Sequence, residues 1–126
     1  MSKEIWFRYD LNDIVLEEQD NITHSHFDKD IHILTQIGHA YYALEKKYDD
    51  VSINFSRHPR DVFLHSKNKE SLENAFRDFI TIAGTPSYTF TPNKRIIKKV
   101  LKEFGLKTKS KLSDLFIVYT VVPDKT

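Results

Sequence analysis

Leu115–Val122 reads Leu-Phe-Ile-Val-Tyr-Thr-Val-Val, the longest apolar run in the chain. Thr120 is its only interruption, and most of its residues are β-branched or aromatic, which favours a strand over a helix. A strand this uniformly apolar is usually covered on both faces. We therefore expect it to lie in the interior of a β-sheet and to end at Pro123. It is too short to span a bilayer as a helix.

Shorter stretches upstream alternate apolar and polar residues, which is the pattern of half-buried strands. Val51, Ile53 and Phe55 alternate with polar residues, and an apolar stretch returns after Pro59. This arrangement predicts a hairpin, with a short helical turn starting at Pro59 as the alternative for its second half. Strands are expected over residues 4–9, 14–16, 51–55, 61–65 and 87–90.

Three segments repeat apolar residues every three or four positions, as amphipathic helices do. Gly84 and Gly105 stand where helices commonly end, and Phe104 is expected on a buried helix face. Gly38 lies inside the first helical segment, which suggests close approach of another backbone. Helices are expected over residues 26–48, 69–83 and 92–104, and residues 107–111 are expected to form a basic connection.

These elements predict the fold class. We expect a single α+β domain over residues 1–126, with a mixed sheet of about five or six strands and three helices in the order β-β-α-β-β-α-β-α-β. Hydrophobic residues make up 40% of the chain and charged residues 29%, which is ordinary for one globular core. No internal repeat or low-complexity segment divides the sequence.

The chain contains no cysteine, which removes disulfides, thiol catalysis and cysteine-based metal sites. No stretch near the N-terminus has the apolar character of a secretory signal, so a cytoplasmic location is expected. Only three glycines are present, too few for the familiar nucleotide-binding loops. We expect no cofactor, no membrane association and no enzymatic activity.

Charge is distributed unevenly along the chain. The segment from Lys94 to Lys111 carries a net charge of +7, whereas the whole chain carries +1, so the remainder sums to −6. An acidic surface suits binding to a basic protein such as a toxin or nuclease. We therefore expect a non-catalytic protein-binding domain, a stoichiometric inhibitor of the toxin-immunity or phage-inhibitor kind. The expected partner-binding residues are Asp10, Asp13, Glu17, Glu18 and Asp20.

The basic segment supports an alternative, a metal-independent ribonuclease or RNA-binding protein. Basic side chains spaced along one side of a helix can follow a phosphate backbone. The loop Arg57–Asp61 adds guanidinium and imidazole groups that can hold a phosphate and move a proton. The residues of this alternative are Arg57, His58, Arg60, Arg95, Lys98 and Lys102.

A histidine cluster is the remaining candidate. His24, His26 and His32 are of the type that binds zinc, and Asp28 lies among them. The same residues also fit the polar start of a helix, with Ser25 and Asp28 as capping groups. We expect no metal site here.

Overall fold

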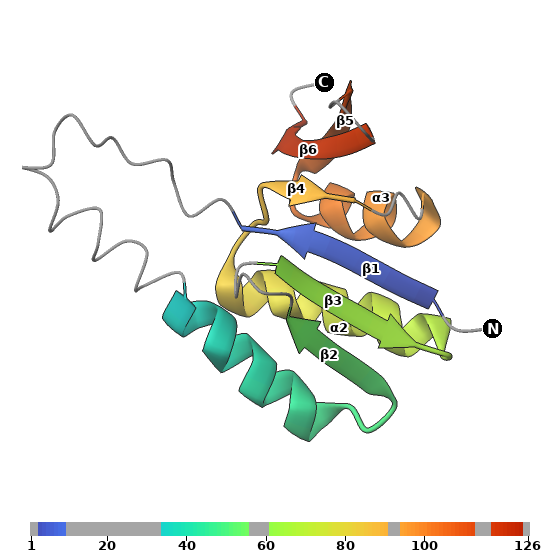
Figure 1. Ribbon diagram of the computed structural model, residues 1–126. Coiled ribbons are helices and arrows are strands. Elements are labelled where there is room, and N and C mark those ends of the chain that lie inside the picture. The colour runs from blue at the N-terminus through green and yellow to red at the C-terminus, as the bar shows by residue number, and fades with distance from the viewer. Residues whose placement is uncertain (1–2, 10–33, 56–60, 91–93, 113–116, 125–126) are drawn as a thin grey trace, which may run out of the picture.

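The structure is a computed structural model that describes residues 3–9, 34–55, 61–90, 94–112 and 117–124. Six strands form one sheet in the order β2-β3-β1-β4-β6-β5, and every neighbouring pair is antiparallel (Figure 1). β1 lies in the middle of this order and pairs with both β3 and β4. The strands are β1 (Lys3–Arg8), β2 (Val51–Phe55), β3 (Asp61–Ser66), β4 (Tyr88–Thr89), β5 (Leu106–Leu112) and β6 (Ile117–Pro123).

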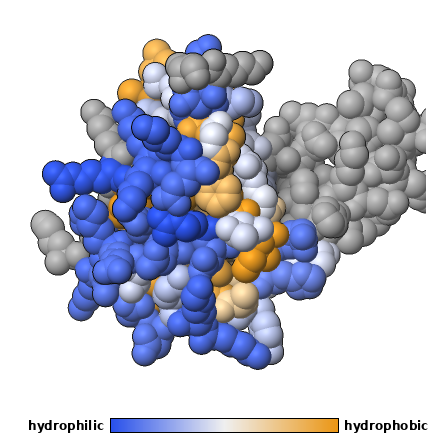
Figure 2. Space-filling model, turned by 180° about the vertical axis from the view of Figure 1, so that it is seen from behind, coloured by the Kyte–Doolittle hydropathy of each residue, from blue (hydrophilic) through white to orange (hydrophobic). Residues whose placement is uncertain are grey.

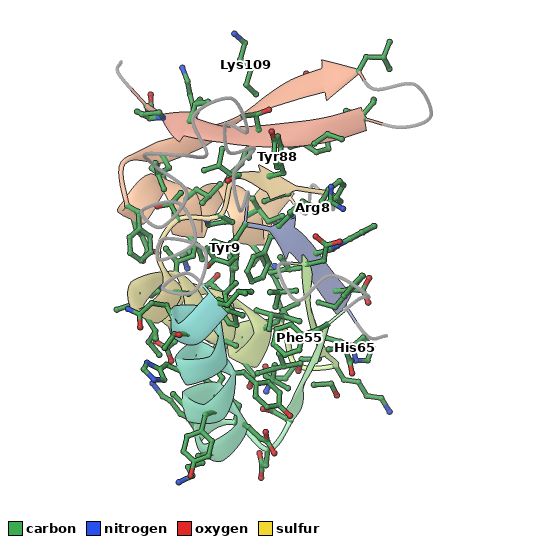
Figure 3. All side chains as sticks on the ribbon, turned by 60° about the vertical axis from the view of Figure 1, so that its left-hand side comes forward. Arg8, Tyr9, Phe55, His65, Tyr88 and Lys109 are labelled. Carbon is green, nitrogen blue, oxygen red and sulfur yellow. The ribbon has the colours of Figure 1, made fainter. Side chains whose placement is uncertain are left out.

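Three helices pack on one face of the sheet. They are α2 (Lys69–Ala83), α3 (Lys94–Glu103) and a helix described over residues 34–47. Figure 3 views the molecule with the helices to the left and β1 and β3 to the right. The expected α+β class, with six strands and three helices, is confirmed.

Aromatic and aliphatic side chains fill the space between the sheet and the helices. Phe7 from β1 and Phe76 and Phe79 from α2 are fully buried, with ring centroids 5.2 Å apart in both pairs that include Phe7. Tyr9 is buried beside them and donates a hydrogen bond from its hydroxyl to the Gly84 carbonyl at 2.8 Å. Burial raises the pKa of the Tyr9 hydroxyl well above its ordinary value.

Local signals at the ends of α2 agree with the sequence. The Asn68 side chain accepts hydrogen bonds from the Glu70 and Ser71 amides at 2.9 and 3.2 Å, which satisfies donors that a helix start leaves free. At the other end Gly84 has φ 92°, a left-handed conformation that glycine adopts without strain. Residues 61–66 form a strand that pairs with β2, so the hairpin prediction is confirmed and the alternative of a helical turn over these residues is wrong.

Several expectations need correction. Residues 107–111 lie within β5, an edge strand, and are not a simple connection. β6 is interior as expected, between β4 and β5, but its side chains are only partly buried or exposed, so the expected cover on both faces is wrong. Phe104 is 39% exposed because it lies in the turn after α3.

The expectation for Gly38 needs correction as well. Gly38 is exposed in the helix over residues 34–47, and a Cβ atom added there would meet no atom within 4 Å. Close approach of another backbone therefore does not explain this glycine. The expected strand over 14–16 and the start of the first helix lie outside the described residues.

Candidate nucleic-acid interface

α3 separates its apolar and basic residues cleanly. Its buried side, made of Ile96, Ile97, Val100 and Leu101, is at most 1% exposed and packs in the core. Arg95, Lys98 and Lys102 are exposed on the opposite side, as the sequence predicted. The helix thus fixes three cations on one surface by burying the residues between them.

β5 adds two more cations at the edge of the sheet. Lys107 and Lys109 are both exposed, and they lie opposite Val122 and Thr120 of β6. Because alternate residues of a strand point to the same side, both lysines project from one face of β5, the face opposite the one from which Leu106 packs against the core. Figure 3 shows Lys109 extending outward from this edge. We call Arg95, Lys98, Lys102, Lys107 and Lys109 the basic band.

A hollow of about 340 Å³ lies where α3 and β5 meet. Lys98, Lys102 and Lys107 contribute to its wall, so the hollow lies within the basic band. The other lining residues are Leu106, Thr108 and Asp124. Asp124 is held next to the helix end because its amide donates to the Gly105 carbonyl at 2.9 Å.

The cations of the basic band have no carboxylate partner among the residues that the structure describes. Glu103 is close in sequence, but Arg77 of α2 holds it through hydrogen bonds of 2.7 and 2.8 Å. These hydrogen bonds lower the pKa of Glu103 and raise that of Arg77, which stabilises both charged forms. Lys99 points instead to Glu73, at 3.1 Å. The band therefore keeps its positive charge available to a ligand.

The helix side of the molecule has a largely hydrophilic surface, broken by smaller hydrophobic areas (Figure 2). Charged and polar side chains exposed on the helices account for this surface. Within the described ranges, no helix is both long and apolar enough to cross a membrane.

The loop of the ribonuclease alternative is described only at its end. Arg57, His58 and Arg60 lie outside the described residues, whereas Asp61 is 3% exposed at the start of β3. The Asp61 carboxylate accepts two hydrogen bonds from Arg8 of β1, at 2.5 and 2.9 Å. A buried carboxylate held by a guanidinium group is poorly placed to accept a proton from a substrate.

An aromatic stack lies on the face of the sheet opposite the helices. Trp6 lies between Phe63 and Phe90, with ring centroids 4.8 and 4.4 Å apart and nearly parallel planes. Arg8 lies over the Phe90 ring at 4.9 Å. The faces of Trp6 are therefore occupied by neighbouring rings and cannot stack on a base. No local sequence pattern predicts this stack, because its rings come from β1, β3 and the residue after β4.

The other predicted sites lie outside the described residues. This applies to the acidic set (Asp10, Asp13, Glu17, Glu18 and Asp20) and to His24, His26 and His32. In the part of the chain that the structure describes, no three histidine, aspartate or glutamate residues are placed to hold a metal ion. The chain matches no protein-family model, no curated protein and no solved structure.

Proposed function

We propose that the protein is a non-catalytic domain that binds nucleic acid through the basic band. The observation that carries this proposal is the set of five exposed cations on α3 and β5, none of them paired with a carboxylate among the described residues. Such cations attract a polyanion, and binding is favoured because it releases counterions that are condensed on the polyanion.

The spacing of the cations favours an extended polyanion over an acidic protein patch. Lys98 and Lys102 are one helical turn apart, so their Cβ atoms are separated by about 6 Å. Lys107 and Lys109 are two strand residues apart, about 6.7 Å. Regular intervals of this size match successive phosphates of a nucleic-acid strand. Four of the five cations are lysines, which bind phosphate as point charges and read little base sequence.

The test measures the affinity of fluorescent single-stranded RNA, single-stranded DNA and duplex by anisotropy at several salt concentrations. Replacing Arg95, Lys98 and Lys102 together with Gln should weaken binding and reduce the slope of log K against log salt by about 2 for single strands. Lys67→Gln is the matched control, because Lys67 is exposed and lies outside the basic band. Equal affinity and slope in the triple variant and wild type would refute the proposal.

The two other hypotheses are tested by further variants. Inhibition of a toxin or nuclease through the acidic residues stays a prediction, and Asp13 and Glu17 changed to Lys should slow association with such a partner. RNA cleavage that disappears on changing Arg57 or His58 would instead support the ribonuclease alternative. The nucleic-acid proposal expects the RNA to be recovered intact.

A further inference from the structure

The hollow between α3 and β5 gathers charge at one point of the basic band. Lys98 and Lys102 approach it from α3, and Lys107 approaches it from β5. Together with the Asp124 carboxylate, these three lysines give its lining a formal charge of +2.

The other lining residues suit a nucleotide. Thr108 is partly buried and offers a hydroxyl group that can donate to a phosphate oxygen. Leu106 is partly buried too, because it packs against the core, and it forms the apolar part of the lining. A volume of about 340 Å³ is at the small end of the range for ligand sites, which fits one phosphorylated unit.

The charge of the lining distinguishes between kinds of phosphate. An internal phosphodiester carries one negative charge, whereas a phosphomonoester carries about −1.5 to −2 at neutral pH. A lining of +2 is the closer complement of the phosphomonoester. We propose that this hollow binds the terminal phosphate of a nucleic-acid strand. The inference rests on the proposed function, which supplies the class of ligand.

The experiment compares strands of one sequence that differ only at their ends. Affinities are measured by anisotropy, at one salt concentration, for oligonucleotides with a 5′-phosphate, with a 3′-phosphate or with hydroxyl groups at both ends. One phosphorylated strand should bind about three- to tenfold more tightly than the hydroxyl strand. The preferred end identifies the direction of the strand on the band.

Variants inside and outside the hollow separate this effect from overall charge. Lys102→Gln and Lys107→Gln should bring the ratio of the affinity for the phosphorylated strand to that for the hydroxyl strand close to one. Arg95→Gln and Lys109→Gln remove the same charge from parts of the band outside the hollow, so they should weaken all strands and preserve the ratio. A ratio that falls equally in all four variants would refute the assignment to the hollow.

The outcomes distinguish this inference from the proposed function. Salt-dependent binding with a ratio of one in the wild-type protein overturns the inference and leaves the proposed function standing. Absence of binding by every strand overturns the proposed function. A titration with inorganic phosphate then tests whether the hollow binds an anion. It is followed through the amide NMR signals of Leu106, Lys107 and Thr108. Shifts that Lys107→Gln abolishes support an anion site, and unchanged spectra overturn it.

Discussion

Replacing Gly38 with alanine should stabilise the protein. Gly38 lies in a helix and is exposed, and an added Cβ atom would meet nothing within 4 Å. Glycine in a helix interior lowers stability by about 0.5–1 kcal/mol relative to alanine, mainly because glycine has more backbone freedom in the unfolded chain and loses it on folding. No steric term opposes this gain here. We therefore expect the free energy of unfolding to rise by about 0.5–1 kcal/mol.

Urea unfolding followed by circular dichroism measures this change. The midpoint should rise while the slope m stays constant, because the surface exposed on unfolding hardly changes. In a chain of this length, the melting temperature should rise by about 2–5 °C. The substitution changes no backbone hydrogen-bonding group, so far-ultraviolet spectra of the two folded proteins should overlap.

Gly105→Ala is the matched control. Gly105 also has open space around it, but its φ of 73° is a left-handed conformation that strains alanine. This variant should lose about 1 kcal/mol. If Gly38→Ala is instead destabilising with an unchanged m, a close contact at Gly38 exists after all. The reasoning from helix propensity would then be wrong.

The ion pairs of two arginines give further predictions. Arg8→Met should lower the free energy of unfolding in urea by about 2–3 kcal/mol, because it removes the guanidinium partner of the Asp61 carboxylate, which is only 4% exposed. A loss below about 0.5 kcal/mol would contradict this. Arg77→Met should cost about 1 kcal/mol near pH 7, because Arg77 binds Glu103 and Glu73. Both glutamate pKa values are lowered in the folded protein, so this stability is present above pH 4.5 and is lost as pH falls through the lowered values. The stability difference from wild type should therefore shrink in unfolding curves at pH 3, and a constant difference would contradict the linkage.

The sequence predicted those parts of the fold in which local pattern and burial agree. α2 has an apolar stripe and a glycine after its last turn, and the structure places both as expected. The sequence does not predict β5, because Lys107 and Lys109 alternate with Thr108 and Ser110, a pattern that is also typical of a polar loop. An edge strand tolerates such a sequence, since its neighbour supplies the hydrogen bonds on one side and lysine deters pairing on the other.

The candidate interface was predictable only in its helical half. The spacing of Arg95, Lys98 and Lys102 places them on one helix surface, whatever the tertiary structure. The position of Lys107 beside the same hollow as Lys98 and Lys102 depends on the turn at Gly105, because this turn sets the angle between α3 and β5. Pairs such as Arg8 and Asp61 are 53 residues apart, and no local period reveals them.

The central position of β1 has a consequence for how the protein folds. The hairpins β2–β3 and β5–β6 each join neighbouring segments and can form early, since short loops close at low entropic cost. β1 is synthesised before both of its partners, yet its ladder with β3 and β4 is what unites the two halves of the sheet. Its contacts span more than fifty residues, so their closure should limit the folding rate. Until then, the nascent chain exposes two unpaired strand borders on which a chaperone can act.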